Sequence, residues 1–163
     1  GTEESGVNAG QPNLFKNKPW VVTPDNNTDQ KALEVIHQIS LSLGCRWISA
    51  EAEIHDEAVG LISHLPVFIS AALLNTLSED INPSLYSLAK SIASSGFADT
   101  SRVGGGNPKL GVSMAKFNKK NLMKSLLSYR HSLDLFEKYL LEENWDEVEK
   151  ILVKTHKTRE DLI

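Results

Sequence analysis

The sequence predicts a mainly α-helical fold, a multi-helix domain that carries one short strand at its N-terminal side. From Thr28 onward, apolar residues recur every three or four positions, which is the period of an amphipathic helix. Before that point the chain is polar and rich in Gly, Asn and Pro, and its single β-rich run, residues 20–23, lies between two prolines. One strand is not stable alone, so we expect this run to join a sheet from elsewhere.

The first two helices follow from caps and apolar spacing. Thr28 is a good N-cap, and the first apolar stripe stops at Gly44. That stripe consists of Leu33, Ile36, Ile39 and Leu43. Residues 45–48 are expected to form a short extended link, and a longer helix begins around His55. Its apolar positions are Val59, Ile62, Leu65, Ile69, Leu73 and Leu77. Pro66 lies inside this helix and lacks a backbone N–H, so the helix should kink there.

Two further helices begin at Asn-Pro pairs. Asn82 and Pro83 cap a helix that carries Leu85, Leu88 and Ile92 and ends near Gly96. Residues 97–106 include three consecutive glycines, and we expect a loop there. A second Asn-Pro pair, Asn107 and Pro108, restarts a helix through Leu110, Met114 and Phe117.

The C-terminal part is predicted as two helices. A helix from about residue 118 to residue 142 carries Leu122, Leu126, Tyr129, Leu133, Phe136 and Leu140. Asn144 and Glu147 have the spacing of a capping box, which starts a last helix through Val148 and Leu152.

Composition excludes several classes of protein. The chain has 163 residues, 40% of them apolar, and a formal net charge of −4, which suits an ordinary folded domain and disfavours nucleic-acid binding. One cysteine, Cys45, cannot form an internal disulfide. The nearly uncharged stretch 58–76 contains Gly60, Pro66 and Asn75, so we interpret it as a buried helix and not as a membrane span. No signal peptide is apparent. We therefore expect a cytoplasmic protein with no nucleic-acid or membrane partner.

Two residues stand out as candidate ligand contacts, each with an ordinary structural alternative. His64 lies just before the expected kink in an apolar segment, where it either binds a ligand or is a core histidine satisfied by the backbone. Arg102 lies in a glycine-rich segment, where it either grips a carboxylate or pairs with Asp99 at the surface. The glycine run 104–106 lacks the spacing of a dinucleotide fingerprint, but glycines there let the backbone approach a ligand or another helix closely.

Metal binding is not predicted. Glu34 and His37 have the Glu-x-x-His spacing of carboxylate-bridged metal bundles, but such bundles need the motif twice and the chain has it once. His55, His131 and His156 have no paired spacing with Cys or carboxylates that indicates zinc.

Four peptides together resemble the prephenate/arogenate dehydrogenase family of tyrosine biosynthesis. They are GTEESG at 1–6, HD at 55–56 with ISHLP at 62–66, GFADTSR at 96–102, and NPKL at 107–110. The peptides RW at 46–47 and YRHS at 129–132 look closest to cyanobacterial members.

The resemblance implies a two-domain enzyme. In the family, a Rossmann domain binds the nicotinamide cofactor, a helical domain similar to the C-terminal domain of 6-phosphogluconate dehydrogenase forms an intertwined homodimer, and the substrate lies between the domains. By this resemblance, residues 1–27 are the end of the nucleotide-binding domain, a loop plus its last strand. Residues 28–163 are the helical dimerisation and substrate-binding domain.

The resemblance also implies the reaction and its residues. Hydride leaves the substrate ring for the nicotinamide, and loss of the ring carboxylate yields an aromatic product. The catalytic histidine of the family is expected just before Gly1, so no catalytic residue is assigned within these 163 residues. The implied substrate-binding residues are Glu3 in the gating loop, Ser63 and His64 in the kinked helix, Arg102 as the carboxylate clamp, and Asp99, which orients Arg102 or the loop around it.

The preferred substrate is inferred from one departure from the family pattern, and the preferred cofactor from analogy with cyanobacterial members. Val67 replaces a histidine that many prephenate-using members have after Leu-Pro, which favours arogenate over prephenate. NADP is preferred over NAD by analogy with cyanobacterial members, and tyrosine is the expected inhibitor. Two alternatives remain open: a non-enzymatic helical dimerisation module, and the helical half of a hydroxyacid dehydrogenase, for whose catalytic lysine no matching motif is present.

Overall fold

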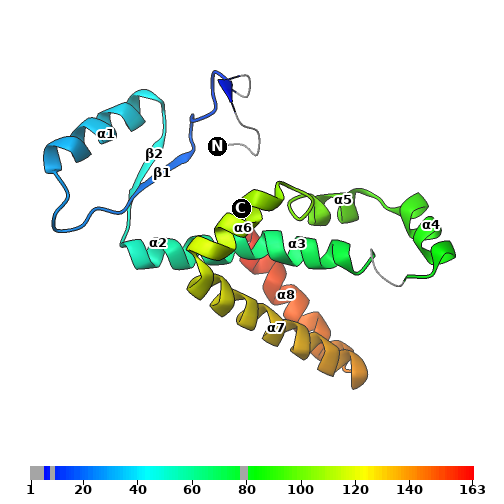
Figure 1. The fold of residues 1–163 in the computed structure, drawn as a ribbon. Coiled ribbons are helices and arrows are strands. Elements are labelled where there is room, and N and C mark those ends of the chain that lie inside the picture. Colours follow the sequence, from blue (N-terminus) through cyan, green and yellow to red (C-terminus); the bar gives the residue numbers. More distant parts are fainter. Residues whose placement is uncertain (1–5, 8–9, 78–80) are drawn as a thin grey trace. The chain divides into compact units, whose positions relative to one another are not determined.

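The computed structural model describes residues 6–7, 10–77 and 81–163 of the chain (Figure 1). The fold is mainly helical, as predicted. The chain forms two compact units, residues 1–122 and residues 123–163, which are described separately below.

The first unit opens with a parallel strand pair. Strand β1 (Pro19–Val22) pairs with β2 (Arg46–Ser49), and helix α1 (Gln30–Ser42) connects them. The register places Trp20 opposite Trp47. The predicted strand is therefore present, but its partner lies within the chain. Residues 46–48 of the expected extended link belong to that partner strand, β2. A two-stranded sheet is marginal alone, so further strands would be needed for a stable sheet.

The boundaries of α1 follow from capping. Asp29, not the expected Thr28, is the N-cap, because its side chain accepts a hydrogen bond from the Lys31 N–H at 2.8 Å. Thr28 instead donates its hydroxyl to Asp25 in the preceding turn. At the other end Gly44 has φ of +72°, and the Cys45 N–H donates to the Ser40 carbonyl. This is a Schellman ending, which requires a residue that tolerates positive φ.

A continuous helix from Ala52 to Asn75 contains a π-helical turn in its middle. Helix α2 (Ala52–Val59) runs into the π-helical turn η2 (Gly60–His64), which runs into α3 (Leu65–Asn75). The Leu65 N–H donates to the Gly60 carbonyl, five residues earlier. Pro66 follows at once and has no N–H to continue the α-helical ladder. The predicted irregularity at Pro66 is therefore a π-bulge, a feature common at functional sites.

This continuous helix is less buried than expected. By length and composition its 24 residues could cross a membrane: an 18-residue window has a mean hydropathy of 1.7, and 17% of that window is buried. A core helix of a soluble protein also has such a composition. The expectation that 58–76 is a buried helix is thus wrong for the chain by itself, because Leu61 and Ile62 are more than half exposed.

Two helices follow the segment that the structure leaves undescribed. Helix α4 (Pro83–Ile92) begins as predicted, because the Asn82 side chain accepts from the Ser84 N–H at 2.8 Å. Helix α5 (Ser95–Ser101) corrects the expected loop at 97–106, of which only the part after Ser101 is a turn. Helix α5 packs against α3. Within the described residues, α4 makes no extensive packing contact with another element.

The remaining helices agree with their predicted bounds. Helix α6 (Pro108–Phe117) is capped by Asn107, which accepts from the Lys109 N–H. Helix α7 (Lys119–Leu141) begins in the first unit, and α8 (Trp145–Leu162) lies in the second. Asn144 caps α8 by accepting from the Glu147 N–H at 3.3 Å.

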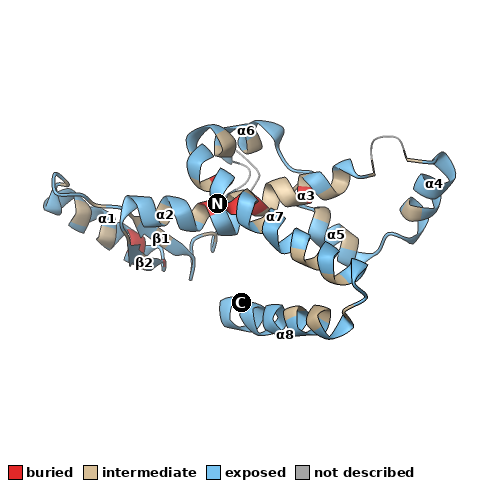
Figure 2. Ribbon diagram, turned by 90° about the horizontal axis from the view of Figure 1, so that it is seen from below, coloured by how far each residue is buried: buried red, intermediate tan, exposed pale blue. Residues whose placement is uncertain are grey.

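The interior of the described chain is small. Its buried apolar side chains are Cys45, Leu65 and Leu122. Figure 2 shows how few positions are buried and how much of α4 is exposed. An amphipathic chain of this length normally covers more of its apolar surface, so these apolar faces are suited to contact with other protein.

Candidate functional site

His64 is the last residue of the π-helical turn and is half-buried. Its Nδ1 lies 3.4 Å from the Asn118 side-chain nitrogen. Burial lowers the pKa of His64 below its usual value, and the negative charge of Asp56 acts in the opposite direction. The neutral imidazole is therefore favoured, which suits a group that donates or accepts a hydrogen bond.

Asn118 joins three parts of the first unit around His64. Its side-chain nitrogen donates to the Asp56 carbonyl at 2.7 Å, and its side-chain oxygen accepts from Asn121 at 2.9 Å. Gly60 makes this approach possible, since a Cβ there would lie 3.1 Å from the Asn121 Cβ. Sequence reasoning did not single out Asn118 or Asn121, because they lie more than fifty residues from His64 and no spacing rule connects them.

Arg102 lies at the C-terminal cap of α5, and its side chain is exposed. The turn that follows is held against α3 by Gly104, whose N–H donates to the buried hydroxyl of Ser70 at 2.8 Å. A Cβ on Gly104 would lie 2.3 Å from the Ala71 nitrogen, so only glycine fits. The close approach of this glycine run to another helix, one of the two uses considered, is present in the structure. Arg102 is therefore anchored to the same continuous helix as His64.

Two other predicted substrate contacts lie on the π-helical turn η2 and on helix α5. Ser63 is exposed on the π-helical turn, next to His64. Asp99 is exposed on α5, one helical turn before Arg102. Glu3 lies outside the described residues. The roles of all five residues stay predictions.

Of the Glu-x-x-His pair expected at the surface, Glu34 is exposed and His37 is half-buried. Glu34 is exposed and accepts from the Gln38 side chain at 2.7 Å. The His37 ring packs on Trp47, with 4.6 Å between ring centroids. Within residues 6–7, 10–77 and 81–163, no group of three or more His, Cys, Asp or Glu side chains is placed to hold a metal ion.

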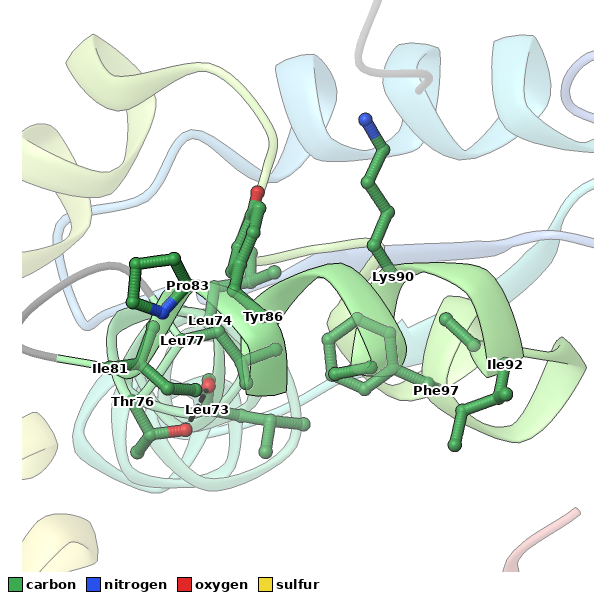
Figure 3. A pocket seen from close by; sticks show the side chains of 12 residues that line it. Leu73, Leu74, Thr76, Leu77, Ile81, Pro83, Tyr86, Lys90, Ile92 and Phe97 are labelled. Carbon is green, nitrogen blue, oxygen red and sulfur yellow. Dashed lines mark hydrogen bonds between the residues drawn. The ribbon is translucent and has the colours of Figure 1, made fainter.

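An apolar groove of about 1020 Å³ lies between α3, α4 and α5 (Figure 3). Apolar side chains line the groove: Leu73 from α3, Leu77 from the turn that follows α3, Ile92 from α4 and Phe97 from α5. Tyr86 extends from the same helix as Ile92. The groove has none of the predicted substrate contacts in its lining, so it is separate from them.

Two family models match the chain in consecutive segments. Residues 1–49 match the nucleotide-binding domain of prephenate dehydrogenase, and residues 51–154 match the dimerisation domain of prephenate dehydrogenase. These models divide the chain at residue 50, after β2. The boundary expected after residue 27 stays a prediction.

Curated relatives are named as dehydrogenases. The chain is 27% identical to prephenate dehydrogenase of Bacillus subtilis (strain 168) over 144 residues, which are 88% of this chain and 38% of that protein. It is 34% identical to cyclohexadienyl dehydrogenase of Zymomonas mobilis over 110 residues, 68% of this chain and 37% of that protein. The chain thus spans little more than a third of these relatives.

Solved structures of similar proteins superpose along the whole chain. Arogenate dehydrogenase of Synechocystis is 40% identical with a TM-score of 0.89, and the match covers 100% of this chain and 59% of that one. Prephenate dehydrogenase of Aquifex aeolicus, solved with hydroxyphenyl propionate and NAD+, is 28% identical with a TM-score of 0.89, covering 100% of this chain and 56% of that one.

Proposed function

The chain belongs to the prephenate dehydrogenase family, and we propose that it is the helical part of an arogenate/prephenate dehydrogenase. The whole enzyme oxidises and decarboxylates its substrate while it reduces a nicotinamide cofactor. The observation that carries this proposal is the match along the entire chain to an arogenate dehydrogenase at 40% identity. We place the enzyme in the cytoplasm, without a nucleic-acid or membrane partner and with tyrosine as its inhibitor.

Arg102 is proposed as the clamp for a substrate carboxylate. A guanidinium forms two parallel hydrogen bonds with a carboxylate, which fixes both position and orientation. The anchoring of the following turn through Gly104 and Ser70 supports this role, because a clamp must be held in place to orient its ligand. Asp99 is proposed to orient Arg102 or the loop around it, Ser63 and His64 are proposed to contact the substrate from the π-helical turn, and Glu3 is carried over from the family resemblance as a further substrate contact.

Arogenate is the proposed preferred substrate. Arogenate carries an ammonium group on its side chain where prephenate has a keto group. Val67 offers no hydrogen bond at the position where a histidine would favour prephenate. The similarity to an arogenate dehydrogenase supports the same preference.

NADP is the proposed cofactor, held mainly by residues outside this chain. The connection from β1 to α1, residues 23–29, contains no glycine. A dinucleotide needs a glycine-rich strand-to-helix turn so that the backbone can approach the pyrophosphate. The strand pair fits the edge of such a sheet. Ile36 and Ile39 of α1 and Leu43 at its C-cap are exposed and suit packing within a larger nucleotide-binding domain.

A homodimer is the proposed assembly. Helix α4 exposes Leu85, Leu88 and Ile92 and lies beside an open apolar groove. An obligate dimer buries apolar surfaces of this kind. The match to a dimerisation domain supports this assignment.

The activity is tested on the full-length protein that carries this chain. Cofactor reduction is measured with arogenate and with prephenate, each with NADP and with NAD, and again with added tyrosine. We expect the highest kcat/KM with arogenate and NADP. Absence of cofactor reduction with all four combinations would contradict the proposal and favour the non-enzymatic dimerisation module.

The clamp is tested by Arg102→Ala and Arg102→Lys in the same assay. Loss of hydrogen bonds to a charged group predicts an increase in KM of about 10- to 150-fold for Arg102→Ala. Arg102→Lys keeps the charge without the two-pronged geometry, so its KM should be intermediate. Arg159→Ala on α8 removes an arginine outside the proposed site and serves as the control. An unchanged KM for Arg102→Ala would reject the clamp.

A further inference from the structure

The amide of Asn118 faces the ring of His64 with a defined orientation. Two hydrogen bonds fix that orientation: the Asn118 nitrogen donates to the Asp56 carbonyl at 2.7 Å, and the Asn118 oxygen accepts from the Asn121 nitrogen at 2.9 Å. Rotating the amide by half a turn would bring its oxygen against the Asp56 carbonyl and its nitrogen against the Asn121 nitrogen. Both contacts would be repulsive, so the observed orientation is the stable one.

This orientation determines which nitrogen of His64 carries the proton. The Asn118 nitrogen has two hydrogens and no acceptor capacity, and the one not used by Asp56 is available to His64 Nδ1 at 3.4 Å. Nδ1 must therefore accept. In a neutral imidazole the proton is then on Nε2.

We propose that Asn118 is a positioning residue that holds His64 in the neutral Nε2–H form, so that Nε2–H donates to an oxygen acceptor of the substrate. The use of that donor by substrate rests on the function proposed above, whereas the choice of tautomer does not. A second proton, on Nδ1, would face the amide hydrogens of Asn118, so this arrangement also opposes the imidazolium.

The backbone around His64 is built to permit this contact. The π-helical turn ends at His64 with the Leu65 N–H donating to Gly60, and Pro66 follows. The first turn of α7 approaches closely because Gly60 has no side chain: a Cβ there would lie 3.1 Å from the nearest atom of that turn. The lowered pKa of His64, caused by burial, agrees with a neutral ring. The side-chain amide of Asn118, at the junction of α6 and α7, thus contacts both the α2 backbone and the ring of His64 in η2.

The tautomer is measured by two-bond ¹H–¹⁵N correlation spectra of histidine rings in the full-length protein, with His64 assigned through His64→Gln. We expect the Nε2–H pattern for His64 in the unsubstituted protein. Asn118→Asp replaces the donor with an acceptor of the same shape, so His64 should change to the Nδ1–H or doubly protonated pattern. Asn82→Asp, which adds the same charge at a cap where Asp is equally suitable, should leave the pattern unchanged.

The same variants are assayed for substrate use. Asn118→Asp should raise KM about tenfold, the cost of losing one hydrogen bond to a charged group, with a smaller change in kcat. Should Asn118→Asp fail to fold, the spectrum of the unsubstituted protein still tests the tautomer, and His64→Gln and His64→Asn test donation to the substrate from the Nε2 position. Glutamine places its amide near the Nε2 position, so KM of His64→Gln should stay within a few-fold of the unsubstituted value. Asparagine places its amide near Nδ1, so KM of His64→Asn should rise further.

The outcomes separate the two proposals. An Nδ1–H pattern in the unsubstituted protein, or an unchanged pattern in Asn118→Asp, would overturn the positioning role. A changed pattern with unchanged KM would overturn the donation to substrate and keep the tautomer assignment. An unsubstituted protein without dehydrogenase activity would overturn the proposed function, while the spectra would still decide the tautomer.

Discussion

At Gly104, the backbone of the turn after α5 packs directly against the backbone of α3. Its N–H bonds to the Ser70 hydroxyl, and the space for a Cβ is already taken by the backbone of α3 at Ala71. Backbone atoms within a helix move less readily than the end of a flexible side chain. The position of Arg102, two residues earlier, therefore depends on the absence of a side chain at Gly104.

We expect Gly104→Ala to destabilise the protein by about 1–3 kcal/mol, the cost typical of overpacking. The measurement is the thermal unfolding midpoint, together with KM for the substrate. Gly105→Ala is the matched control, since its nearest new neighbour would be 3.8 Å away at ordinary contact distance. Equal midpoints for the two variants would contradict the close approach.

His64 makes stability depend on pH in a defined direction. Its folded pKa is lowered by burial, so the unfolded chain binds a proton more readily than the folded one. Stability is then full above the unfolded pKa of about 6.5 and decreases as the pH falls from there toward the folded pKa. Of the titratable groups around it, Asp56 is the one whose charge acts against the shift.

We expect His64→Gln to lose less stability than the unsubstituted protein as the pH is lowered from about 8 to about 5. The measurement is the unfolding free energy from urea titrations at each pH. His131→Gln, at an exposed position on α7, is the control and should follow the unsubstituted protein. Parallel curves for His64→Gln and the unsubstituted protein would rule out this contribution.

Among the elements, those with strong local signals could be predicted from sequence. The starts of α4, α6 and α8 are predictable because Asn82, Asn107 and Asn144 cap the backbone that immediately follows them. The irregularity before Pro66 is predictable for a similar reason, because a missing N–H acts on the adjacent turn. In each case the cause and the effect lie within about one helical turn.

Elements that depend on contacts between residues distant in the sequence could not be predicted in this way. The sequence of β2 indicates an extended segment, because Trp47 and Ile48 favour strands, but it does not indicate the partner β1, which lies 27 residues earlier. Helix α5 is short, and its glycine and serine content predicts a loop, but it packs against α3. The contact of Asn118 with His64 also spans the fold. Resemblance could supply His64 and Arg102 as candidates, but it could not supply their neighbours.

Among the described residues, helix α4 makes no extensive packing contact with another element. We expect Leu85→Glu with Leu88→Glu to convert the proposed homodimer into a monomer, because two charges would have to be buried in an apolar contact. Light scattering of the full-length protein gives the mass. Ser87→Glu adds a charge at a polar position on the same helix and should leave the dimer intact. A dimeric mass for the double variant would exclude α4 from the interface.

On the scale of the whole molecule, apolar surface is distributed over faces rather than gathered in one interior. The first unit contains the strand pair, the helix with the π-helical turn, and helices α4 to α6. The second contains most of α7 and all of α8, which together line a cavity of about 440 Å³. Each has large exposed apolar side chains. These exposed apolar faces agree with the proposed homodimer and with packing against further nucleotide-binding structure, in line with the two family matches.

The small interior has a consequence for abundance. With few buried apolar side chains among the described residues, the proposed homodimer would contribute to the free energy of folding, and mass action would then make the folded fraction rise with concentration. Freshly made copies of such a dimer would be most open to proteases while they are scarce and would become protected as they accumulate. Expression level would therefore set the lifetime of each copy as well as the number of copies.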